Sequence, residues 1–146
     1  MHRAQSFINP RRENFVRISE TMPSKLELVD GFVSLLLTKI FELTLNKSIT
    51  FDSKLALHEA LINAVKHGNK MDHELQVQVD VTKEDGQLVI QVTDQGKGFD
   101  FMDIPDPITP ENLEKLNGRG IFLIQNAMDK VEFSDQGRTI KMTKIL

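Results

Sequence analysis

The sequence contains no cysteine, which excludes disulfides, thiolate metal sites and a cysteine nucleophile. This absence fits a reducing compartment, and we expect a cytoplasmic protein. Long runs of Lys or Arg are also missing, and the formal net charge is −3. Sequence-independent nucleic-acid binding draws on concentrated positive charge, so no direct nucleic-acid partner is expected.

Long hydrophobic runs are absent as well. The first ten residues have no apolar core of the kind that a signal peptide needs. The most apolar stretch, 32–45, is interrupted by the polar residues Ser34, Thr38, Lys39, Glu42 and Thr44. We therefore expect a soluble protein without a membrane partner.

The chain has 146 residues, of which 40% are hydrophobic, and this fits one globular domain with a single function. We interpret residues 1–13 as a flexible N-terminal tail and 14–146 as the domain. A short strand is expected around 14–19, followed by a helix from 24 to about 45. The apolar stripe of that helix follows the helical period and predicts core positions: Val29, Phe32, Leu36, Ile40 and Leu43.

A second helix is predicted from 52 or 53 to 67, ending in a left-handed cap at Gly68-Asn69. Two strands follow, in which apolar and polar residues alternate from 76 to 81 and from 88 to 92. The dipeptide Asp85-Gly86 between them is typical of a tight hairpin.

The segment 99–117 has three prolines and little periodicity, which is typical of a functional lid or of disorder. Only a short helical piece is expected there, at 110–116. A third helix is predicted from 120 to about 129. A last hairpin is predicted from 131–133 and 139–145.

The second helix carries a polar stripe opposite its apolar face, made by Glu59, Asn63, Lys66 and His67. The simplest interpretation is a solvated surface helix, but Asn is a poor choice for an exposed helix interior. The carboxamide oxygen of Asn63 suits a hydrated Mg²⁺ ion, which takes few protein ligands. One turn away, Glu59 could deprotonate a hydroxyl that attacks a γ-phosphate.

Asp94 directly follows a strand and precedes Gly96 and Gly98. Glycines let the backbone approach a flat ligand closely, and a carboxylate at a strand end could accept a hydrogen bond from the amine of adenine. An ordinary Asp-x-Gly turn is the alternative. Thr139, on the final strand, is a weaker candidate to support Asp94 directly or through water.

Gly118, Arg119 and Gly120 precede the third helix, so free backbone amides and the helix dipole could face phosphate oxygens. Neither the Rossmann fingerprint nor the Walker motif is present, which excludes an ordinary P-loop.

Taken together, the segments 59–68, 94–99 and 118–120 resemble the N box and the two glycine boxes of the GHKL (Bergerat-fold) ATPases. Within that superfamily they are most similar to the anti-sigma-factor serine kinases of the RsbW/SpoIIAB group. The resemblance implies an α+β, two-layer sandwich with a helical layer on a mixed, mainly antiparallel sheet. It also implies ATP and Mg²⁺ held between the N-box helix and an ATP lid at about 99–117.

The resemblance implies Glu59 as the general base, Asn63 as the Mg²⁺ ligand and Asp94 as the residue that recognises adenine. The predicted nucleotide-binding residues are Asn63, Lys66, His67, Asp94, Gly96, Gly98, Gly118, Arg119, Gly120 and Thr139. Arg119 departs from the family, where an apolar residue is frequent, and this leaves partner recognition open. The remaining histidines, His2, His58 and His73, have no companion at zinc-ligand spacing.

The leading hypothesis is a protein serine/threonine kinase of a partner-switching system. As the resemblance implies, it would phosphorylate a STAS-domain antagonist (an anti-anti-sigma protein), sequester a sigma factor and form a homodimer. A second hypothesis keeps the kinase with a client other than a sigma factor. A third is a nucleotide-dependent binding module without catalysis, against which the presence of Glu59 speaks.

Overall fold

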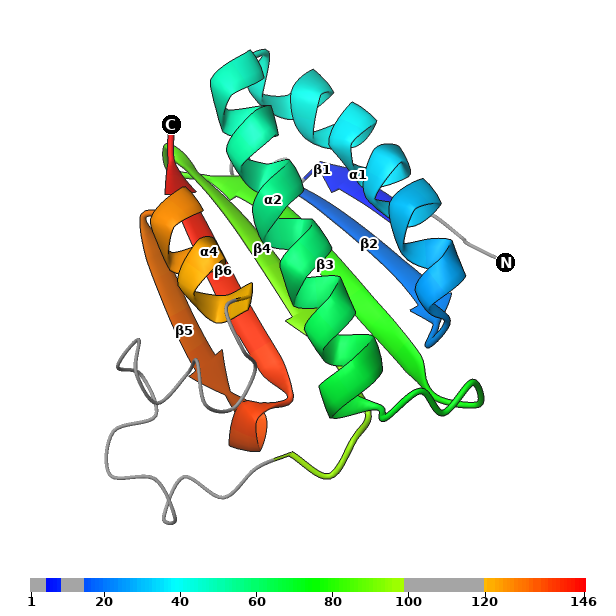
Figure 1. The fold of residues 1–146 in the computed structure, drawn as a ribbon. Helices are drawn as coiled ribbons and strands as arrows, with labels where there is room; N and C mark the ends of the chain where they lie inside the picture. The colour runs from blue at the N-terminus through cyan, green and yellow to red at the C-terminus, as the bar shows by residue number, and fades with distance from the viewer. Residues whose placement is uncertain (1–4, 9–14, 99–119) are drawn as a thin grey trace.

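The computed structural model describes residues 5–8, 15–98 and 120–146, which form two layers. The helices cover one face of a six-stranded sheet with the order β1-β2-β3-β4-β6-β5, and α2 lies between α1 and α4 (Figure 1). The predicted two-layer α+β sandwich is confirmed. The resemblance implies a mixed, mainly antiparallel sheet. In the structure, every strand pairing among the described residues is antiparallel.

The strands are β1 (Gln5–Ile8), β2 (Val16–Pro23), β3 (Gln76–Glu84), β4 (Gln87–Thr93), β5 (Lys130–Ser134) and β6 (Thr139–Ile145). The helical elements are η1 (Leu26–Leu28), α1 (Val29–Thr44), α2 (Lys47–Asn63), the π-helical turn η2 (Ala64–Gly68), α4 (Gly120–Ala127) and the 3-10 turn η4 (Asp135–Gly137). The predicted lid, its short helix at 110–116, Gly118 and Arg119 lie outside the described residues. Within the described ranges, no helix has the length and apolar character needed to cross a bilayer.

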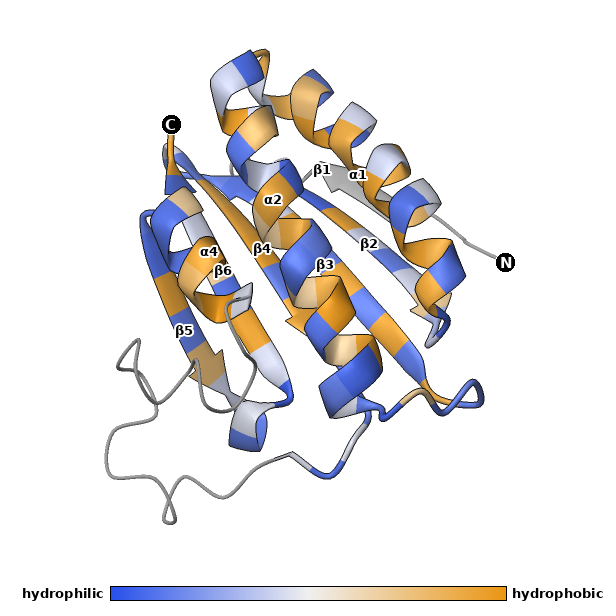
Figure 2. Cartoon of the chain, in the orientation of Figure 1, coloured by the Kyte–Doolittle hydropathy of each residue, from blue (hydrophilic) through white to orange (hydrophobic). Residues whose placement is uncertain are grey.

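The core lies between the helices and the sheet, and strand alternation decides which side chains enter it. Apolar residues of β3 and β4 face the helices, while polar residues alternate with them (Figure 2). The buried members are Val77, Val79, Val81, Leu88, Ile90 and Val92. The predicted stripe of α1 meets them: Val29, Phe32, Leu36 and Ile40 are buried, and Leu43 packs at the margin.

The turn between β3 and β4 is the tight hairpin that its sequence predicts. Asp85 and Gly86 both have left-handed backbone angles, with φ of 53° and 74°. Two consecutive residues with positive φ match the right-handed twist of the flanking strands, and Asp-Gly is favoured in such turns.

The N-terminal segment differs from the predicted flexible tail. Four of its residues form β1, which pairs with β2 in a register that joins Gln5 to Ser19 and Ile8 to Val16. This pairing covers a strand edge that would otherwise be open. The strand predicted at 14–19 is β2, which continues to Pro23 because β3 pairs with it along that whole length.

The second helix differs from its prediction at both ends. It begins at Lys47, because the side chain of Asn46 accepts a hydrogen bond from the backbone N–H of Ile49 at 3.0 Å and caps the helix. Its C-terminus is not a left-handed cap. The chain instead widens into η2, which ends with the N–H of Asn69 donating to the carbonyl of Ala64 at 2.8 Å.

Two lysines fasten the helices to the sheet. Lys83 on β3 donates to the carbonyl oxygen of Leu43 at 2.9 Å, near the end of α1. Lys144 on β6 donates to the carbonyl oxygen of Ala127 at 2.7 Å and pairs with Asp52 of α2 at 2.9 Å. A positive charge is favourable near the C-terminus of a helix, which is where Lys83 meets α1 and Lys144 meets α4. Together with the ion pair between Lys144 and Asp52, these contacts tie α1, α2 and α4 to the sheet.

Candidate functional site

A cavity of about 250 Å³ opens between α2, η2, the loop after β4, α4 and η4. Its floor is apolar and comes from the sheet and helices, while polar groups from separate segments stand around it. The lining residues are Ala60, Asn63, Ala64, His67, Gly68, Val92, Asp94, Gly98, Ile121, Phe133, Gly137, Arg138 and Ile140. An apolar pocket with a few convergent polar groups is the usual form of a small-molecule site.

The polar stripe of α2 is divided between this cavity and its surroundings. The opposite face of the helix is buried as predicted, with Leu57, Ala60 and Leu61 in the core. Asn63 and His67 line the cavity, whereas Lys66 is exposed and does not line it. Glu59 is half-buried beside the cavity, so the stripe is not simply a solvated helix face.

The start of α4 packs directly against the two residues predicted for catalysis and metal binding. A β-carbon added to Gly120 would lie 2.9 Å from Oε2 of Glu59 and 3.1 Å from Nδ2 of Asn63. Any larger residue at this position would force the Glu59 and Asn63 side chains to shift, so glycine is what allows the helix to begin so close to both. The structure therefore brings Glu59, Asn63 and Gly120 together at one end of the cavity.

The amide group of Asn63 is available for a ligand. Its Nδ2 atom is buried and has no hydrogen-bond partner in the part of the chain that the structure describes. A buried polar atom without a partner is costly, and a ligand at this point would relieve the cost. No cluster of three or more His, Asp or Glu side chains within the described ranges is arranged to hold a metal. A metal ion beside Asn63 would therefore take its remaining ligands from a bound molecule and from water.

Next to Glu59, His58 contacts two carboxylates. Its Nε2 lies 3.4 Å from Oδ1 of Asp30 on α1, and its Nδ1 lies 3.8 Å from Oε1 of Glu59. These contacts engage the Oε1 side of the Glu59 carboxylate, while Oε2 faces Gly120.

Asp94 stands at the other end of the cavity, at the end of β4, and is only 9% exposed. Its Oδ1 accepts a hydrogen bond from the N–H of Gly96 at 2.8 Å. Burial raises the pKa of the Asp94 carboxyl, Gly96 and the charge of Arg138 oppose this rise, and Asp135 adds to it. One oxygen of this buried carboxyl group is therefore held by the N–H of Gly96, and the other lies against Gly68.

Two glycines make this arrangement possible. A β-carbon on Gly68 would collide with the carboxylate of Asp94, and one on Gly96 would collide with the backbone carbonyl of Gly68. The end of η2 and the loop after β4 are therefore in direct backbone contact. The sequence predicts Gly68 as part of a helix cap. In the structure, its lack of a side chain is what allows this close approach.

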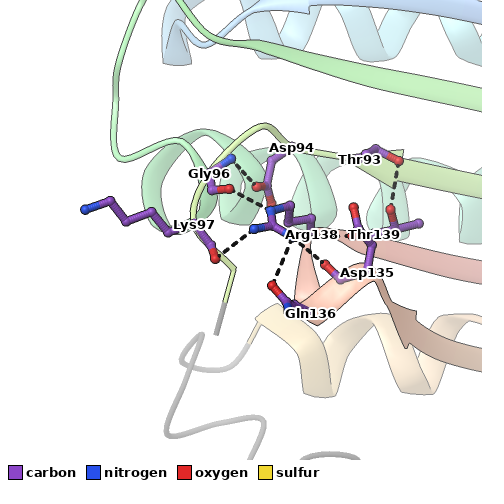
Figure 3. A network of polar contacts seen from close by, with 8 residues as sticks. All are labelled: Thr93, Asp94, Gly96, Lys97, Asp135, Gln136, Arg138 and Thr139. Atoms are coloured by element: carbon purple, nitrogen blue, oxygen red, sulfur yellow. Dashed lines mark hydrogen bonds and ion pairs between the residues drawn. The ribbon is translucent and has the colours of Figure 1, made fainter. Parts of the chain in front are cut away.

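Thr139 lies on β6 beside β4, but its hydroxyl does not reach Asp94. It shares a hydrogen bond of 3.1 Å with the hydroxyl of Thr93, its direct partner in the β4–β6 register (Figure 3). The prediction of direct support for Asp94 is not met, because Thr93 faces the same side of the sheet and takes the hydroxyl. Gly98 lines the cavity as expected for a loop glycine.

No sequence pattern points to Arg138, which holds the loop after β4 in place. Its Nε donates to the carbonyl oxygen of Gly96 at 2.7 Å, and its Nη2 donates to that of Lys97 at 3.1 Å. Its Nη1 contacts Asp135 and Gln136 of η4 (Figure 3). A single Arg just before a strand has no pattern to mark it, since most of its partners are backbone carbonyls.

Asn69 also holds the loop after β4. The sequence predicts this residue as part of a helix cap. It is 2% exposed, and its Nδ2 donates to Oγ of Ser24 at 2.6 Å and to the carbonyl oxygen of Gln76 at 3.0 Å. Its Oδ1 accepts from the N–H of Gln95 at 2.8 Å. The loop that carries Asp94 is thus anchored to β2, β3 and β6.

We expect Asn69→Ala to lower the free energy of unfolding by about 2 kcal/mol, because it leaves the buried hydroxyl of Ser24 and the backbone N–H of Gln95 without their partner. Urea denaturation measures the change. His73→Ala, at an exposed neighbouring position, is the matched control and should stay within about 0.5 kcal/mol of the parent chain. Equal unfolding midpoints for the Asn69 variant and the parent chain would contradict the anchoring role.

Comparison with known proteins agrees with this geometry. Residues 22–144 match the family model described as "Histidine kinase-like ATPase domain". The chain is 36% identical over 104 residues to a protein named serine-protein kinase RsbW from Staphylococcus epidermidis. It is 33% identical over 102 residues to proteins of the same name from Listeria monocytogenes and Listeria innocua. Each match covers 65% of this chain and 65% of the relative, just under two thirds of its length.

Proposed function

We propose a function from the premise that the chain belongs to the histidine kinase-like ATPase domain family. It is an ATP-dependent protein serine/threonine kinase of a partner-switching system. It phosphorylates a STAS-domain antagonist of an anti-sigma factor, and it acts itself as the anti-sigma factor by sequestering a sigma factor. The relatives named serine-protein kinase RsbW support the choice of a protein as the phosphate acceptor.

The observation that carries the proposal is the convergence of three sequence segments on one cavity. Asp94 lies at one end, and Glu59 and Asn63 lie with Gly120 at the other. An adenine ring against Asp94 would direct the phosphates toward Asn63 and the start of α4. The amides at the start of a helix favour phosphate oxygens, so the distribution of groups suits a nucleoside triphosphate.

Base recognition rests on Asp94. Its carboxylate accepts a hydrogen bond from the exocyclic amine of adenine, while a guanine would present a carbonyl oxygen at the same point. Because an unpaired or opposed buried polar group costs about 1–3 kcal/mol, the site prefers ATP to GTP. Burial raises the pKa of the Asp94 carboxyl, and the N–H of Gly96 and the charge of Arg138 oppose that rise and favour the charged form.

Proton transfer rests on Glu59. Its carboxylate accepts the proton of the attacking serine or threonine hydroxyl, while the hydroxyl oxygen forms a bond to the γ-phosphorus and ADP leaves. The half-buried position of the side chain and its contacts with His58 and Gly120 restrict where the carboxylate can point. A fixed base raises the rate because it needs no reorganisation when the hydroxyl arrives.

Asn63 is the protein ligand proposed for Mg²⁺, through its carboxamide oxygen Oδ1, while its Nδ2, which has no partner among the described residues, is a donor that suits a phosphate oxygen beside the ion. When bound there, Mg²⁺ would neutralise charge on the phosphate oxygens. His67, which lines the cavity, and Lys66, which is exposed outside it, are proposed to contact the nucleotide as well. Gly118, Arg119 and a lid at 99–117 complete the proposal, together with a homodimeric assembly.

The test incubates the purified chain with labelled ATP, MgCl₂ and the STAS-domain protein encoded nearby. We expect label on a serine or threonine of that protein, and we expect a pull-down to recover an RNA polymerase specificity subunit. Tight ATP binding without labelled product across a panel of such partners would favour a binding module without catalysis. If the STAS-domain protein is labelled but the pull-down recovers a protein other than a sigma factor, that other protein is the client.

A further inference from the structure

Arg138 is the most highly connected polar side chain at the cavity, and the function proposed above assigns it no role. It joins two elements that are 40 residues apart in sequence, the loop after β4 and the turn η4 (Figure 3). Three of its five hydrogen bonds end on backbone carbonyl oxygens, those of Gly96, Lys97 and Asp135. Its side chain is 26% exposed and lines the cavity.

We propose that Arg138 is a positioning residue for nucleotide recognition, which sets the place and the electrostatic surroundings of Asp94 by holding the loop at Gly96 and Lys97 against η4. This inference rests on the proposed function, because it concerns how the same cavity binds its nucleotide. Arg138 acts through Asp94 and the loop backbone, and it is not a catalytic residue.

The geometry supports an action through the loop. The backbone N–H of Asp94 donates to the carbonyl oxygen of Arg138 at 2.9 Å, and the N–H of Gly96 donates to Asp94. The guanidinium of Arg138 in turn donates to the carbonyl oxygen of Gly96, so Arg138, Asp94 and Gly96 are joined to one another by hydrogen bonds. A planar guanidinium can serve several acceptors at fixed angles, which the ammonium group of a lysine cannot do.

The charge of Arg138 supports the second part of the proposal. Burial raises the pKa of Asp94, Arg138 lowers it, and Asp135 in η4 raises it. The other ionisable groups at this place are His67, on the cavity wall, and Lys97, in the loop itself. Removing the guanidinium therefore raises the pKa of Asp94 further, so that the carboxylate is lost at a higher pH.

Calorimetric titration with ATP and MgCl₂ from pH 5 to pH 8 tests the inference on the parent chain, Arg138→Met and Arg138→Lys. For Arg138→Met we expect affinity about tenfold lower at pH 8, and a loss of affinity on acidification whose midpoint lies at higher pH than in the parent chain. For Arg138→Lys we expect a smaller loss at pH 8 with the midpoint little changed, since the charge remains. Titration of the nucleotide phosphates is common to all three proteins and cancels in the comparison.

Asp94→Asn combined with Arg138→Met provides the control for the origin of the shift. This double variant should not show the displaced midpoint, because it has no carboxyl at position 94. An equal loss of affinity at every pH, without a displaced midpoint in Arg138→Met, would assign Arg138 a merely structural role and overturn the inference. Unchanged binding in both single variants would overturn it as well. Absence of ATP binding by the parent chain would instead refute the proposed function.

Discussion

Glu59→Gln should reduce phosphate transfer to the protein substrate by about 10²- to 10⁴-fold, the range that a positioned general base contributes. The substitution keeps the size and shape of the side chain near Gly120 and one acceptor oxygen, but removes its ability to take a proton. ATP affinity should therefore change by no more than about threefold. Transfer is measured as initial rates with labelled ATP, and affinity by calorimetry.

The control for this experiment is Glu42→Gln, an exposed position on α1 away from the cavity. It should leave both the rate and the affinity unchanged. A Glu59 variant that transfers phosphate at the parent rate would remove Glu59 from the reaction. Loss of both ATP binding and transfer would instead indicate that Glu59 serves the architecture around Gly120.

Gly96→Ala should cost at least tenfold in ATP affinity and about 2–3 kcal/mol in the free energy of unfolding. The new methyl group would meet the backbone carbonyl of Gly68, which belongs to a packed turn and cannot rotate away as a flexible side chain could. The loop and η2 must then separate, and Asp94 moves with the loop. Calorimetry and urea denaturation measure the two effects on the same preparation.

Gly31→Ala on α1 is the matched control, because nothing lies within 4 Å of the added β-carbon. Alanine is the better helix former, so this variant should be more stable than the parent chain by about 0.5–1 kcal/mol. Its ATP affinity should be unchanged. If Gly96→Ala behaved like Gly31→Ala, the close contact between η2 and the loop could not be a requirement of the site.

Much of the fold follows from local sequence signals. Alternating valines predict β3 and β4, Asp85-Gly86 predicts their turn, and the stripe from Val29 to Ile40 predicts the buried face of α1. These features are set by periods of two and 3.6 residues, which a single sequence displays. The family resemblance adds the two-layer arrangement, which periodicity alone does not specify.

The features that the sequence did not reveal depend on partners far away in the chain. Glu20 illustrates this, because it lies in β2 between the buried residues Ile18 and Met22 and is itself 1% exposed. The strand alternation that places it inside was predicted only as far as residue 19. The start of α2 was missed for a different reason, since the cap at Asn46 precedes residues with little helical periodicity.

The residues of the candidate site also fall into two groups, those that the sequence predicts and those that it does not. Glu59, Asn63 and Asp94 lie in motifs with fixed spacing, and the structure places all three around one cavity or beside it. Asn69 and Arg138 act through backbone groups of other segments, and such contacts leave no mark in the sequence. Thr139 is predicted to support Asp94 only from its place on the final strand, whereas its hydroxyl partner is decided by the β4–β6 register.

Titration of the purified chain with ATP and with GTP, each with MgCl₂, tests the central claim most directly. The account predicts saturable binding of one ATP per chain and binding of GTP about tenfold weaker or more, because the carboxylate of Asp94 faces the base. Equal affinity for the two nucleotides, or no heat with either, would contradict the claim that this cavity recognises adenine.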